Sequence, residues 1–576
     1  MTADVEVAVG AEGLLRAFNE AGVLDVADVH VAQRLCALAS ESDERVALAV
    51  ALAVRALRGG SVCVELSTIA GVVGVDDVAW PDPSEWLAAV RASALADAPQ
   101  VLHLYAGRLL YLDRYWREEK QVCDDLIALL ASRPPAAARP SERLFPPDHP
   151  EQREAAKIAL SQAVTVLTGG PGTGKTSTVA RLLAEVAEQA EVAGFAPPRI
   201  ALAAPTGKAA ARLAEAVQLQ LARLDAADRT RLGGLEAMTL HRLLGRRPDS
   251  SSRFRHDRGN RLPHDVIVVD ETSMVSLTLM ARLLEAVRPD ARLILVGDPD
   301  QLASVEAGAV LADLVDGLSG RDDVRVAALR TSYRFGKSIG LLADAIRTGD
   351  SDGALALLRS GDEHIEFIEC NEGDDPSDRL RSVLLPHALR LREAALLGAA
   401  DVALAGLDAH RLLCAHRQGP FGVRRWNRQV EQWLSEETGL PPWSEWYAGR
   451  PLLVTANDYA LRVYNGDTGV AVTGPDGLRA IIAAAAGPLD FAISRLSDVE
   501  TMHAMTIHKS QGSQADEVTV LLPGEESRLL TRELFYTAVT RAKEKVRVVG
   551  SEDSARAAIG RRAMRASGLA DRLRAT

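Results

Sequence analysis

Cysteine is scarce in this sequence. Among 576 residues there are five cysteines, Cys36, Cys63, Cys123, Cys370 and Cys414, and they lie far apart in the chain. An odd number of widely spaced cysteines does not build a disulfide framework, and the C-x-x-C spacing typical of zinc and iron–sulfur sites is missing. The sequence therefore predicts reduced thiols and no metal–thiolate centre.

Long apolar runs and an excess of positive charge are missing as well. No charge-free stretch is long enough to span a bilayer, and the N-terminus, Met-Thr-Ala-Asp-Val-Glu, is acidic where a secretory signal would be basic. These absences predict a cytoplasmic protein with no membrane partner. With 66 Lys and Arg against 78 Asp and Glu, the formal net charge is -12, so nucleic acid would have to be bound by local basic patches.

The length and the patterning indicate several domains. At roughly 100–200 residues per domain, this chain should contain about three to five units. Apolar residues recur at helical spacing in residues 1–132, which predicts a helical N-terminal domain. Six prolines in residues 133–150 exclude regular structure there and indicate a semi-rigid linker.

Beyond the linker, short aliphatic runs alternate with amphipathic helices, which is typical of an α/β fold. Continuous β-branched runs predict strands buried on both faces of a parallel sheet. Two cores are expected, in residues 151–330 and in residues 331–439 together with 501–576. Turn residues around apolar alternation predict a small β insertion at 440–500, and a polar, Arg-rich stretch predicts a short hairpin at 246–264. The runs begin at Val164, Ile200, Val266 and Leu293, and again at Arg411, Val518 and Val546.

A phosphate-binding loop follows the first of these strands. Gly169-Gly-Pro-Gly-Thr-Gly174-Lys175-Thr176 fits G-x-x-x-x-G-K-[ST] between a strand and a helix. Its backbone N–H groups can surround phosphates, Lys175 can reach the β- and γ-phosphates of ATP, and Thr176 can bind Mg²⁺. The residues predicted to contact nucleotide here are Gly169, Gly170, Pro171, Gly172, Thr173, Gly174, Lys175, Thr176 and Ser177.

Two carboxylates, Asp270 and Glu271, follow the predicted strand that begins at Val266. Asp270 is expected to hold Mg²⁺, and Glu271 to act as the general base on the attacking water. An acidic pair at a strand end is also common as a solvated surface feature. Together with the phosphate-binding loop it predicts NTP hydrolysis, but kinases, GTPases and transport ATPases share both motifs.

The remaining motifs resemble those of superfamily 1 DNA helicases, and the resemblance extends from Pro150 to Gly550. The blocks Ala-Pro-Thr-Gly-Lys-Ala-Ala, Val-Asp-Glu-Thr-Ser-Met-Val, Gly-Asp-Pro-Asp-Gln-Leu and Thr-Ile-His-Lys-Ser-Gln-Gly-Ser resemble the RecD branch. The resemblance implies two RecA-like cores, a strand-separating pin at 246–264, an SH3-like domain at 440–500 and an N-terminal partner-binding domain. It also implies 5′ to 3′ unwinding.

The same resemblance assigns the rest of the ATP site. Gln152 would read adenine, Tyr333 would stack on it, and Gln301 would couple the γ-phosphate to DNA. Arg334 and Arg541 would be arginine fingers, which neutralise charge in the transition state. Gly512 and Gln514 would complete the site, although many relatives have Glu at the position of Gln514, which puts ribose discrimination in doubt.

Contacts with DNA are implied by three further motifs. Each combines small, hydroxyl and basic residues at a strand end, which suits phosphate contacts that do not read bases. For the two histidines, a structural role is an alternative. The implied residues are Pro205, Thr206, Lys208, Thr239, His241, Thr506, His508, Lys509 and Ser510.

The resemblance implies a subunit that works with RecB- and RecC-like partners in a heterotrimer on double-strand DNA ends, in recombinational repair. The short N-terminal segment favours this subunit over a stand-alone 5′ to 3′ helicase, and no cluster of nuclease carboxylates is found. Two further hypotheses are a DNA-clamping scaffold with a vestigial ATPase and a P-loop kinase. The intact Lys175, Asp270, Glu271, Arg334 and Arg541 argue against the scaffold, and the kinase leaves the second core unexplained.

Overall fold

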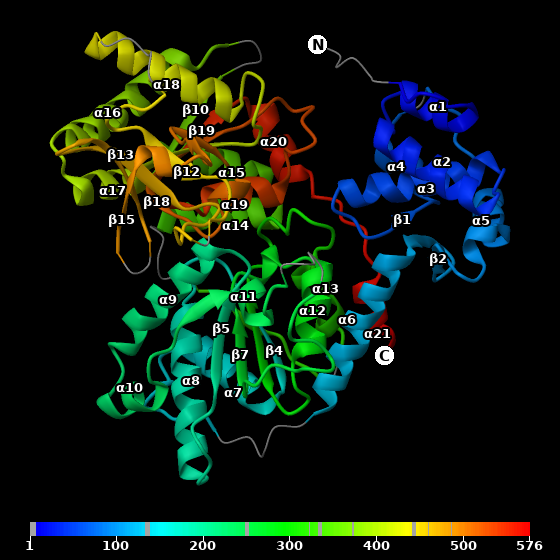
Figure 1. Cartoon of the computed structure of the whole chain (residues 1–576), viewed down its shortest axis with the longest axis horizontal. Coiled ribbons are helices and arrows are strands. Elements are labelled where there is room, and N and C mark those ends of the chain that lie inside the picture. Colours follow the sequence, from blue (N-terminus) through cyan, green and yellow to red (C-terminus); the bar gives the residue numbers. More distant parts are fainter. Residues whose placement is uncertain are drawn as a thin grey trace.

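A computed structural model of the chain describes residues 7–75, 77–132, 139–247, 253–321, 323–331, 337–370, 374–439, 445–458, 460–484 and 487–576. Figure 1 shows three bodies: a small N-terminal domain (blue), a first lobe (cyan to green) and a second lobe (yellow-green to orange). The C-terminal segment (red) runs from the second lobe back to the N-terminal domain and the first lobe. Among the described residues, no helix has the length and apolarity needed to cross a membrane.

The N-terminal domain is mainly helical, as predicted, but it also contains a small antiparallel sheet. Helix α3 is typical: Asp43 accepts a hydrogen bond from the Arg45 amide at its start, and the alanines and leucines of its buried face fill the domain core. The sheet, in the order β1-β3-β2, was not predicted because its strands are very short. The elements are α1 (Gly13–Glu20), α2 (Val26–Ala39), α3 (Glu44–Arg58), β1 (Val64–Glu65), α4 (Ile69–Val73), α5 (Pro83–Ala92), η1 (Ala94–Ala96), β2 (Leu102–Tyr105), β3 (Leu109–Leu112) and α6 (Asp113–Ala131).

The predicted linker is only partly a linker. Residues 139–149 form no regular element, as the prolines require, but Leu144 and Phe145 are buried in the core of the first lobe. Pro150 already belongs to helix α7 (Pro150–Ser161), where its missing N–H costs nothing at the first turn. The second half of the segment is therefore anchored to the lobe.

The first lobe is built on a parallel sheet. Within the described residues the sheet has six strands in the order β6-β5-β7-β8-β4-β9, and each neighbouring pair is parallel. Val164 of β4, the strand that precedes the phosphate-binding loop, lies opposite Leu293 of β8. The predicted strands and crossover helices of this core are confirmed. The strands are β4 (Val164–Gly169), β5 (Ile200–Ala204), β6 (Ala237–Thr239), β7 (Val266–Val269), β8 (Arg292–Gly297) and β9 (Ala327–Leu329), and the helices after α7 are α8 (Lys175–Val192), α9 (Gly207–Leu221), α10 (Ala226–Leu232), α11 (Leu240–Leu244), η2 (Thr272–Met274), α12 (Leu277–Ala286) and α13 (Val310–Ser319).

The second lobe has its own parallel sheet, as predicted. In the part of the chain that the structure describes, five strands run in the order β10-β19-β18-β11-β17. The strands are β10 (Ile365–Glu369), β11 (His410–Cys414), β17 (Ala504–Thr506), β18 (Ala515–Leu521) and β19 (Ala542–Gly550). The helices are α14 (Lys337–Thr348), α15 (Ser351–Leu358), α16 (Ser377–Leu396), α17 (Ala400–Ala409), α18 (Val423–Thr438), η4 (His508–Ser510), α19 (Arg532–Val539) and α20 (Glu552–Gly560).

The β insertion between α18 and β17 is also present. Its described strands form an antiparallel sheet in the order β15-β14-β13-β12-β16. The predicted turn at Pro475-Asp476-Gly477 closes the hairpin of β13 and β14, with Gly474 opposite Gly477. The elements are β12 (Pro451–Val454), β13 (Thr468–Gly474), β14 (Gly477–Ile482), β15 (Leu489–Ala492), η3 (Ile493–Arg495) and β16 (Val499–Thr501).

The predicted hairpin at 246–264 appears as two isolated antiparallel bridges. They join Arg246 to Phe254 and Asp257 to Asn260, so the expected Asp257-Arg-Gly-Asn turn is formed. Residues 248–252 lie outside the described part.

The last helix does not belong to the second lobe, although the sequence placed all of residues 501–576 there. Helix α21 (Leu569–Ala575) packs against α13 of the first lobe and against α6. Leu569 and Leu573 are fully buried in this contact, and an amphipathic helix joins whichever apolar surface its connection can reach. Helix α21 therefore attaches residues 569–575 to the first lobe and to α6, a contact that we call the α21 clasp.

Glu119 of α6 binds the segment that contains α21. Its fully buried carboxylate accepts hydrogen bonds from Tyr111 Oη (2.9 Å), Arg572 Nε (2.9 Å), Ser567 Oγ (3.0 Å) and the Gly568 amide (3.2 Å). The Arg572 guanidinium also lies 4.0 Å from the ring centre of Trp116. A buried ion pair in which every lone pair is occupied is costly to break on one side only.

We expect Glu119→Ala to destabilise the attachment of α21 by about 3–5 kcal/mol, because Arg572 would be left buried without its anion. Hydrogen exchange at the amides of residues 566–575 measures this loss directly. Asp124→Ala on the same helix is the matched control, since its ion pair with Lys120 is exposed and should be worth less than about 1 kcal/mol. Equal exchange in the two variants would contradict the assigned role.

Candidate active site

The phosphate-binding loop joins β4 to α8. Gly172 and Gly174 have positive φ values of 81° and 86°, which favour glycine. A Cβ at Gly169 would lie 2.6 Å from Thr173 Oγ1 and 2.7 Å from the Leu329 carbonyl oxygen, so no side chain fits there. Lys175 Nζ donates hydrogen bonds to the carbonyl oxygens of Gly169 and Gly170, the latter at 2.9 Å. The ammonium group therefore lies inside the loop, where phosphate oxygens would be bound.

The two carboxylates at the end of β7 lie close to this lysine. Burial, followed by the charge of Glu271, raises the pKa of Asp270 to about 6, and the nearby Lys175 acts in the opposite direction. Glu271 has a φ of 50°, an unusual backbone conformation for a residue with a side chain. Strain of this kind is concentrated at functional sites. A divalent cation held by the Asp270 carboxylate and the Thr176 hydroxyl would favour the ionised form of Asp270.

Residues of the Gly297-Asp-Pro-Asp-Gln-Leu302 block contact the second lobe. Gln301 donates from Nε2 to Asp298 Oδ2 (3.0 Å), and its Oε1 accepts from Arg541 Nη2 (3.1 Å). Tyr536 Oη also donates to Asp298 Oδ2, at 3.0 Å. All four side chains are at least 94% buried, with Gln301 the most exposed at 6%. Burial raises the pKa of Asp298, and Lys175 lowers it, so this network lies within electrostatic reach of the phosphate-binding loop.

The backbone of Leu302 makes two further hydrogen bonds to the second lobe. Its amide donates to Thr537 Oγ1 (2.9 Å), and its carbonyl oxygen accepts from Gln511 Nε2 (2.7 Å). Its side chain is buried in the hydrophobic core of the second lobe. We call the contact of residues 298–302 with residues 511–541 the lobe interface. The contributions of Tyr536, Thr537 and Gln511 were not predicted.

The predicted adenine-reading residue, Gln152, lies beside the phosphate-binding loop. Gln152 is buried, accepts from Arg181 Nη1 (3.2 Å) and lies 2.9 Å from the position of a Cβ on Gly174. A cavity lined by Gln152, Gly172, Gly174, Ser177 and Arg181 lies here. The predicted Tyr333 and Arg334 lie outside the described residues.

The predicted DNA contacts fall into two groups. Thr206 and Thr239 cap the starts of α9 and α11, where their hydroxyls accept from the amides of Ala209 and Arg242, both at 3.2 Å. Lys208 differs, because its Nζ is buried between the lobes and no described residue accepts a hydrogen bond from it. In this arrangement Lys208 meets a DNA strand only if the lobes separate.

The burial of Lys208 predicts a pH dependence of stability. Desolvation, with smaller contributions from Arg411 and Arg212, lowers the pKa of Lys208 to about 7. In the unfolded chain this lysine keeps its proton up to about pH 10.4, so between these values the unfolded state binds more protons. The free energy of unfolding should therefore rise with pH above about 7, by up to roughly 1.4 kcal/mol per pH unit.

Thermal unfolding at pH 7 and pH 9 measures this dependence. Lys208→Met should be relatively more stable at pH 7 and should lose the rise. A variant with the same pH dependence as the parent would contradict the assignment.

The motif that ends in Gly512 lies on the second lobe beside β17. Thr506 Oγ1 accepts from the Lys509 amide (3.3 Å), and Lys509 Nζ is paired with Glu500 (3.3 Å). Ser510 is buried, and its hydroxyl donates to the Ile507 carbonyl oxygen at 2.7 Å, which indicates a structural role.

The remaining predicted residues lie on both lobes. Gly512 has a φ of 67° and lies against Ala209 of the first lobe, while Gln514 is half-buried. Burial lowers the pKa values of both His241 and His508, which favours the neutral ring at neutral pH. Pro205 is half-buried at the end of β5.

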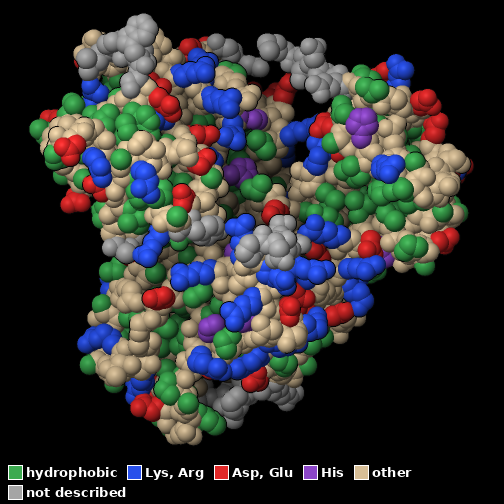
Figure 2. Space-filling view, viewed as in Figure 1, with side chains coloured by type: hydrophobic (Ala, Val, Ile, Leu, Met, Phe, Trp, Pro, Cys, Tyr) green, Lys and Arg blue, Asp and Glu red, His purple; other side chains and the backbone are tan. Residues whose placement is uncertain are grey.

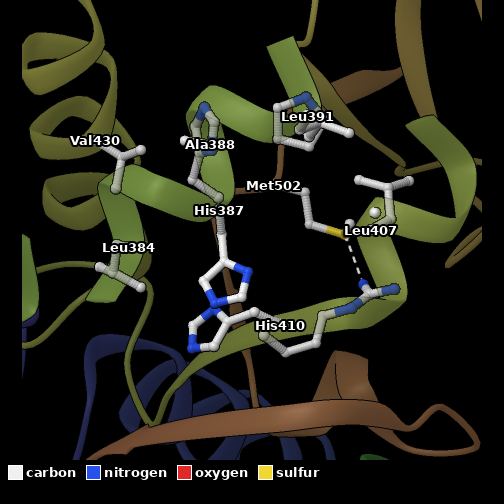
Figure 3. Close-up of a pocket in the computed structure, with 12 residues that line it drawn as sticks. Leu384, His387, Ala388, Leu391, Leu407, His410, Val430 and Met502 are labelled. Atoms are coloured by element: carbon white, nitrogen blue, oxygen red, sulfur yellow. Dashed lines mark hydrogen bonds between the residues drawn. The ribbon is translucent and has the colours of Figure 1, made fainter. Parts of the chain in front are cut away.

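A separate cavity in the second lobe contains none of the predicted site residues. Figure 3 shows His387 and His410 facing one another in it, and their rings stack with centres 4.7 Å apart. The His410 ring is hydrogen bonded to Thr519 Oγ1 (2.9 Å), and burial lowers the pKa of His410 well below its usual value. These histidines are neutral packing residues of the lobe core.

Three known domain families match separate parts of the chain. The family described as AAA domain matches residues 152–307, and the family described as UvrD-like helicase C-terminal domain matches residues 501–549. The family described as RecBCD enzyme subunit RecD, N-terminal domain, matches residues 20–109. The first two matches include both sides of the lobe interface.

Relatives are similar over nearly the whole chain. The RecBCD enzyme subunit RecD of Mycobacterium tuberculosis (strain ATCC 25618 / H37Rv) is 75% identical over 573 residues, which cover 100% of this chain and 99% of the relative. The protein of the same name from Mycolicibacterium smegmatis is 69% identical, over 97% of this chain and 99% of the relative. The ATP-dependent RecD2 DNA helicase of Deinococcus radiodurans is 31% identical, over 81% of this chain and 59% of that longer protein.

Proposed function

The chain belongs to the RecD family of RecBCD enzyme subunits, and from this we propose that its two lobes form the ATP-driven motor of a RecBCD-type DNA helicase. The observation that carries the proposal is the buried connection from Arg541 through Gln301 to Asp298, beside the phosphate-binding loop. Through this connection, binding or hydrolysis of ATP in the loop would change the contact between the first and the second lobe. A change in nucleotide state can then move one lobe relative to the other.

The ATP chemistry follows from the side chains at the interface. When bound, Mg²⁺ would neutralise charge on the phosphates, with Thr176 and Asp270 as its protein ligands. Lys175 would leave the carbonyl oxygens of the loop for the β- and γ-phosphates. Glu271 would orient and deprotonate the attacking water, and Arg541 would supply positive charge from the second lobe. We assign the same charge-neutralising role to Arg334 and adenine stacking to Tyr333.

We propose that a single DNA strand runs over both lobes. Thr206, Lys208, Thr239 and His241 would contact it on the first lobe, and Thr506, His508 and Lys509 on the second. The direction of movement is proposed as 5′ to 3′, with residues 246–264 as the strand-separating pin and residues 440–500 as an SH3-like domain. Phosphate contacts of this type make the binding tolerant of sequence.

The proposed partners are RecB- and RecC-like subunits, with the N-terminal domain of residues 1–132 as the docking part. The family match at residues 20–109 supports the subunit over a stand-alone helicase, since the RecD2 helicase is a longer protein. Nuclease activity on double-strand DNA ends would come from a partner.

Unwinding of tailed duplexes tests the proposal. With Mg²⁺ and ATP, a duplex with a 5′ single-stranded tail should be unwound and one with a 3′ tail should not, by the chain alone or with its partners. Unwinding only from the 3′ tail would overturn the polarity. A protein that binds DNA but hydrolyses no ATP would instead favour a clamping scaffold.

A further inference from the structure

A groove on the second lobe begins at the motif of Thr506 and Lys509. It is bounded by α18 on one side and by β16, β17 and the start of the β insertion on the other. Lys and Arg side chains gather over α18 in the space-filling view of Figure 2. The cations that line the groove are Arg417, Arg424, Arg428, Arg450 and Lys509.

The wall formed by α18 is held rigidly against the other side. Asn427 Nδ2 donates to the Thr501 carbonyl oxygen (2.8 Å), and Asn427 Oδ1 accepts from the Ala504 amide (2.7 Å). Trp426 and Val430 anchor the opposite face of the helix in the lobe core. Arg424 and Arg428 are one helical turn apart, so they extend along the groove on the same face.

These two arginines are available for a ligand. Both are exposed, and neither forms an ion pair with any residue that the structure describes. Two carboxylates of the groove are already engaged, since Glu431 accepts from Tyr447 Oη (3.2 Å) and Glu445 is paired with Arg450 (3.5 Å). The free positive charge of the groove is therefore concentrated on α18.

Glu500 lies between the two other cations of the groove, Arg417 and Lys509. One carboxylate oxygen is paired with Arg417 Nη2 (3.1 Å) and the other with Lys509 Nζ (3.3 Å). Two oxygens that each bind one cation reproduce what a backbone phosphate would offer. The Glu500 side chain is 47% exposed, and exposed ion pairs contribute little, so an incoming phosphate can displace it.

We propose that this groove continues the DNA path beyond Lys509, with Arg417, Arg424 and Arg428 binding phosphates of the single strand. Glu500 serves as an internal substitute for one phosphate and lowers the affinity of the groove for DNA. The inference rests on the proposed function and adds to it a binding surface on α18 and a residue that weakens binding. Weak binding at this end of the path favours release of the strand during stepping.

Equilibrium binding of a labelled oligothymidylate to the full chain, at several salt concentrations, tests the proposal. The double variant Arg424→Ala/Arg428→Ala should bind about tenfold more weakly or worse. It should also lower the slope of log K against log salt by about 1.4, because two phosphate contacts are lost. Arg379→Ala/Arg381→Ala on the neighbouring α16 removes the same charge outside the groove and should leave the slope unchanged.

Glu500→Gln gives an independent result in the opposite direction. It should tighten oligothymidylate binding severalfold, whereas Glu526→Gln, at an exposed site outside the groove, should not. Unchanged affinity and slope in the double variant, or no gain in Glu500→Gln, would overturn the groove proposal while the parent chain still binds DNA. A parent chain that fails to bind the oligothymidylate would overturn the proposed function itself.

Discussion

Lys175→Ala is expected to abolish DNA-stimulated ATP hydrolysis while single-stranded DNA binding stays measurable. Loss of one preorganised charge at a developing anion costs roughly 10²–10³-fold in rate, and Lys175 is the cation inside the phosphate-binding loop. None of the described DNA-contact candidates is hydrogen bonded to it, so the DNA path should remain intact. Steady-state phosphate release and oligothymidylate binding, measured on the same preparation, check both parts.

Lys157→Ala is the matched control for this experiment. Lys157 lies on α7, its side chain is 63% exposed, and its ion pair with Glu154 is long at 3.5 Å. The control should hydrolyse ATP like the parent. If Lys175→Ala kept its DNA-stimulated hydrolysis, the role of the loop lysine would be refuted.

Arg541→Lys is expected to lower kcat for ATP hydrolysis by about 10³-fold with a smaller change in KM. The guanidinium donates at once to Gln301 Oε1 (3.1 Å), to the Thr537 carbonyl oxygen (3.0 Å) and to the Ser513 carbonyl oxygen (3.4 Å). A lysine keeps the charge but cannot reproduce this forked geometry. The lobe interface would then lose the connection through Gln301.

Two further variants define the effect. Arg556→Lys changes an exposed arginine on α20 that is paired with Glu552 and Asp352, and it should behave like the parent. Gln301→Ala combined with Arg541→Lys should be far from additive, because the two residues act through one hydrogen bond. A kcat within twofold of the parent in Arg541→Lys would show that Arg541 is only a packing residue.

The positions of the phosphate-binding loop and of the acidic pair in the fold could be predicted because both motifs are local. The phosphate-binding loop and the Asp270-Glu271 pair each occupy a few consecutive residues at the end of a buried strand, and parallel strands bring such ends to one edge of the sheet. The two sheets and the β insertion were predictable for a similar reason, since β-branched runs and turn residues are visible in short windows.

The lobe interface was much less visible in the sequence. Tyr536 and Thr537 lie in α19, where they follow the same apolar pattern as any buried helix face. Their contacts with Asp298 and Leu302 join residues more than 230 positions apart, so no local spacing indicates them. The clasp of α21 on Glu119 and the burial of Lys208 were missed for the same reason: both depend on how separate bodies pack.

ATP hydrolysis by the parent chain, measured with and without single-stranded DNA, tests the central claim most directly. If the two lobes form a DNA motor, saturating oligothymidylate should raise kcat well above the DNA-free rate, because a strand bound to both lobes would shift their relative arrangement and with it the lobe interface beside the ATP site. The same rate at every DNA concentration, in a protein that binds both ligands, would contradict a motor at this interface.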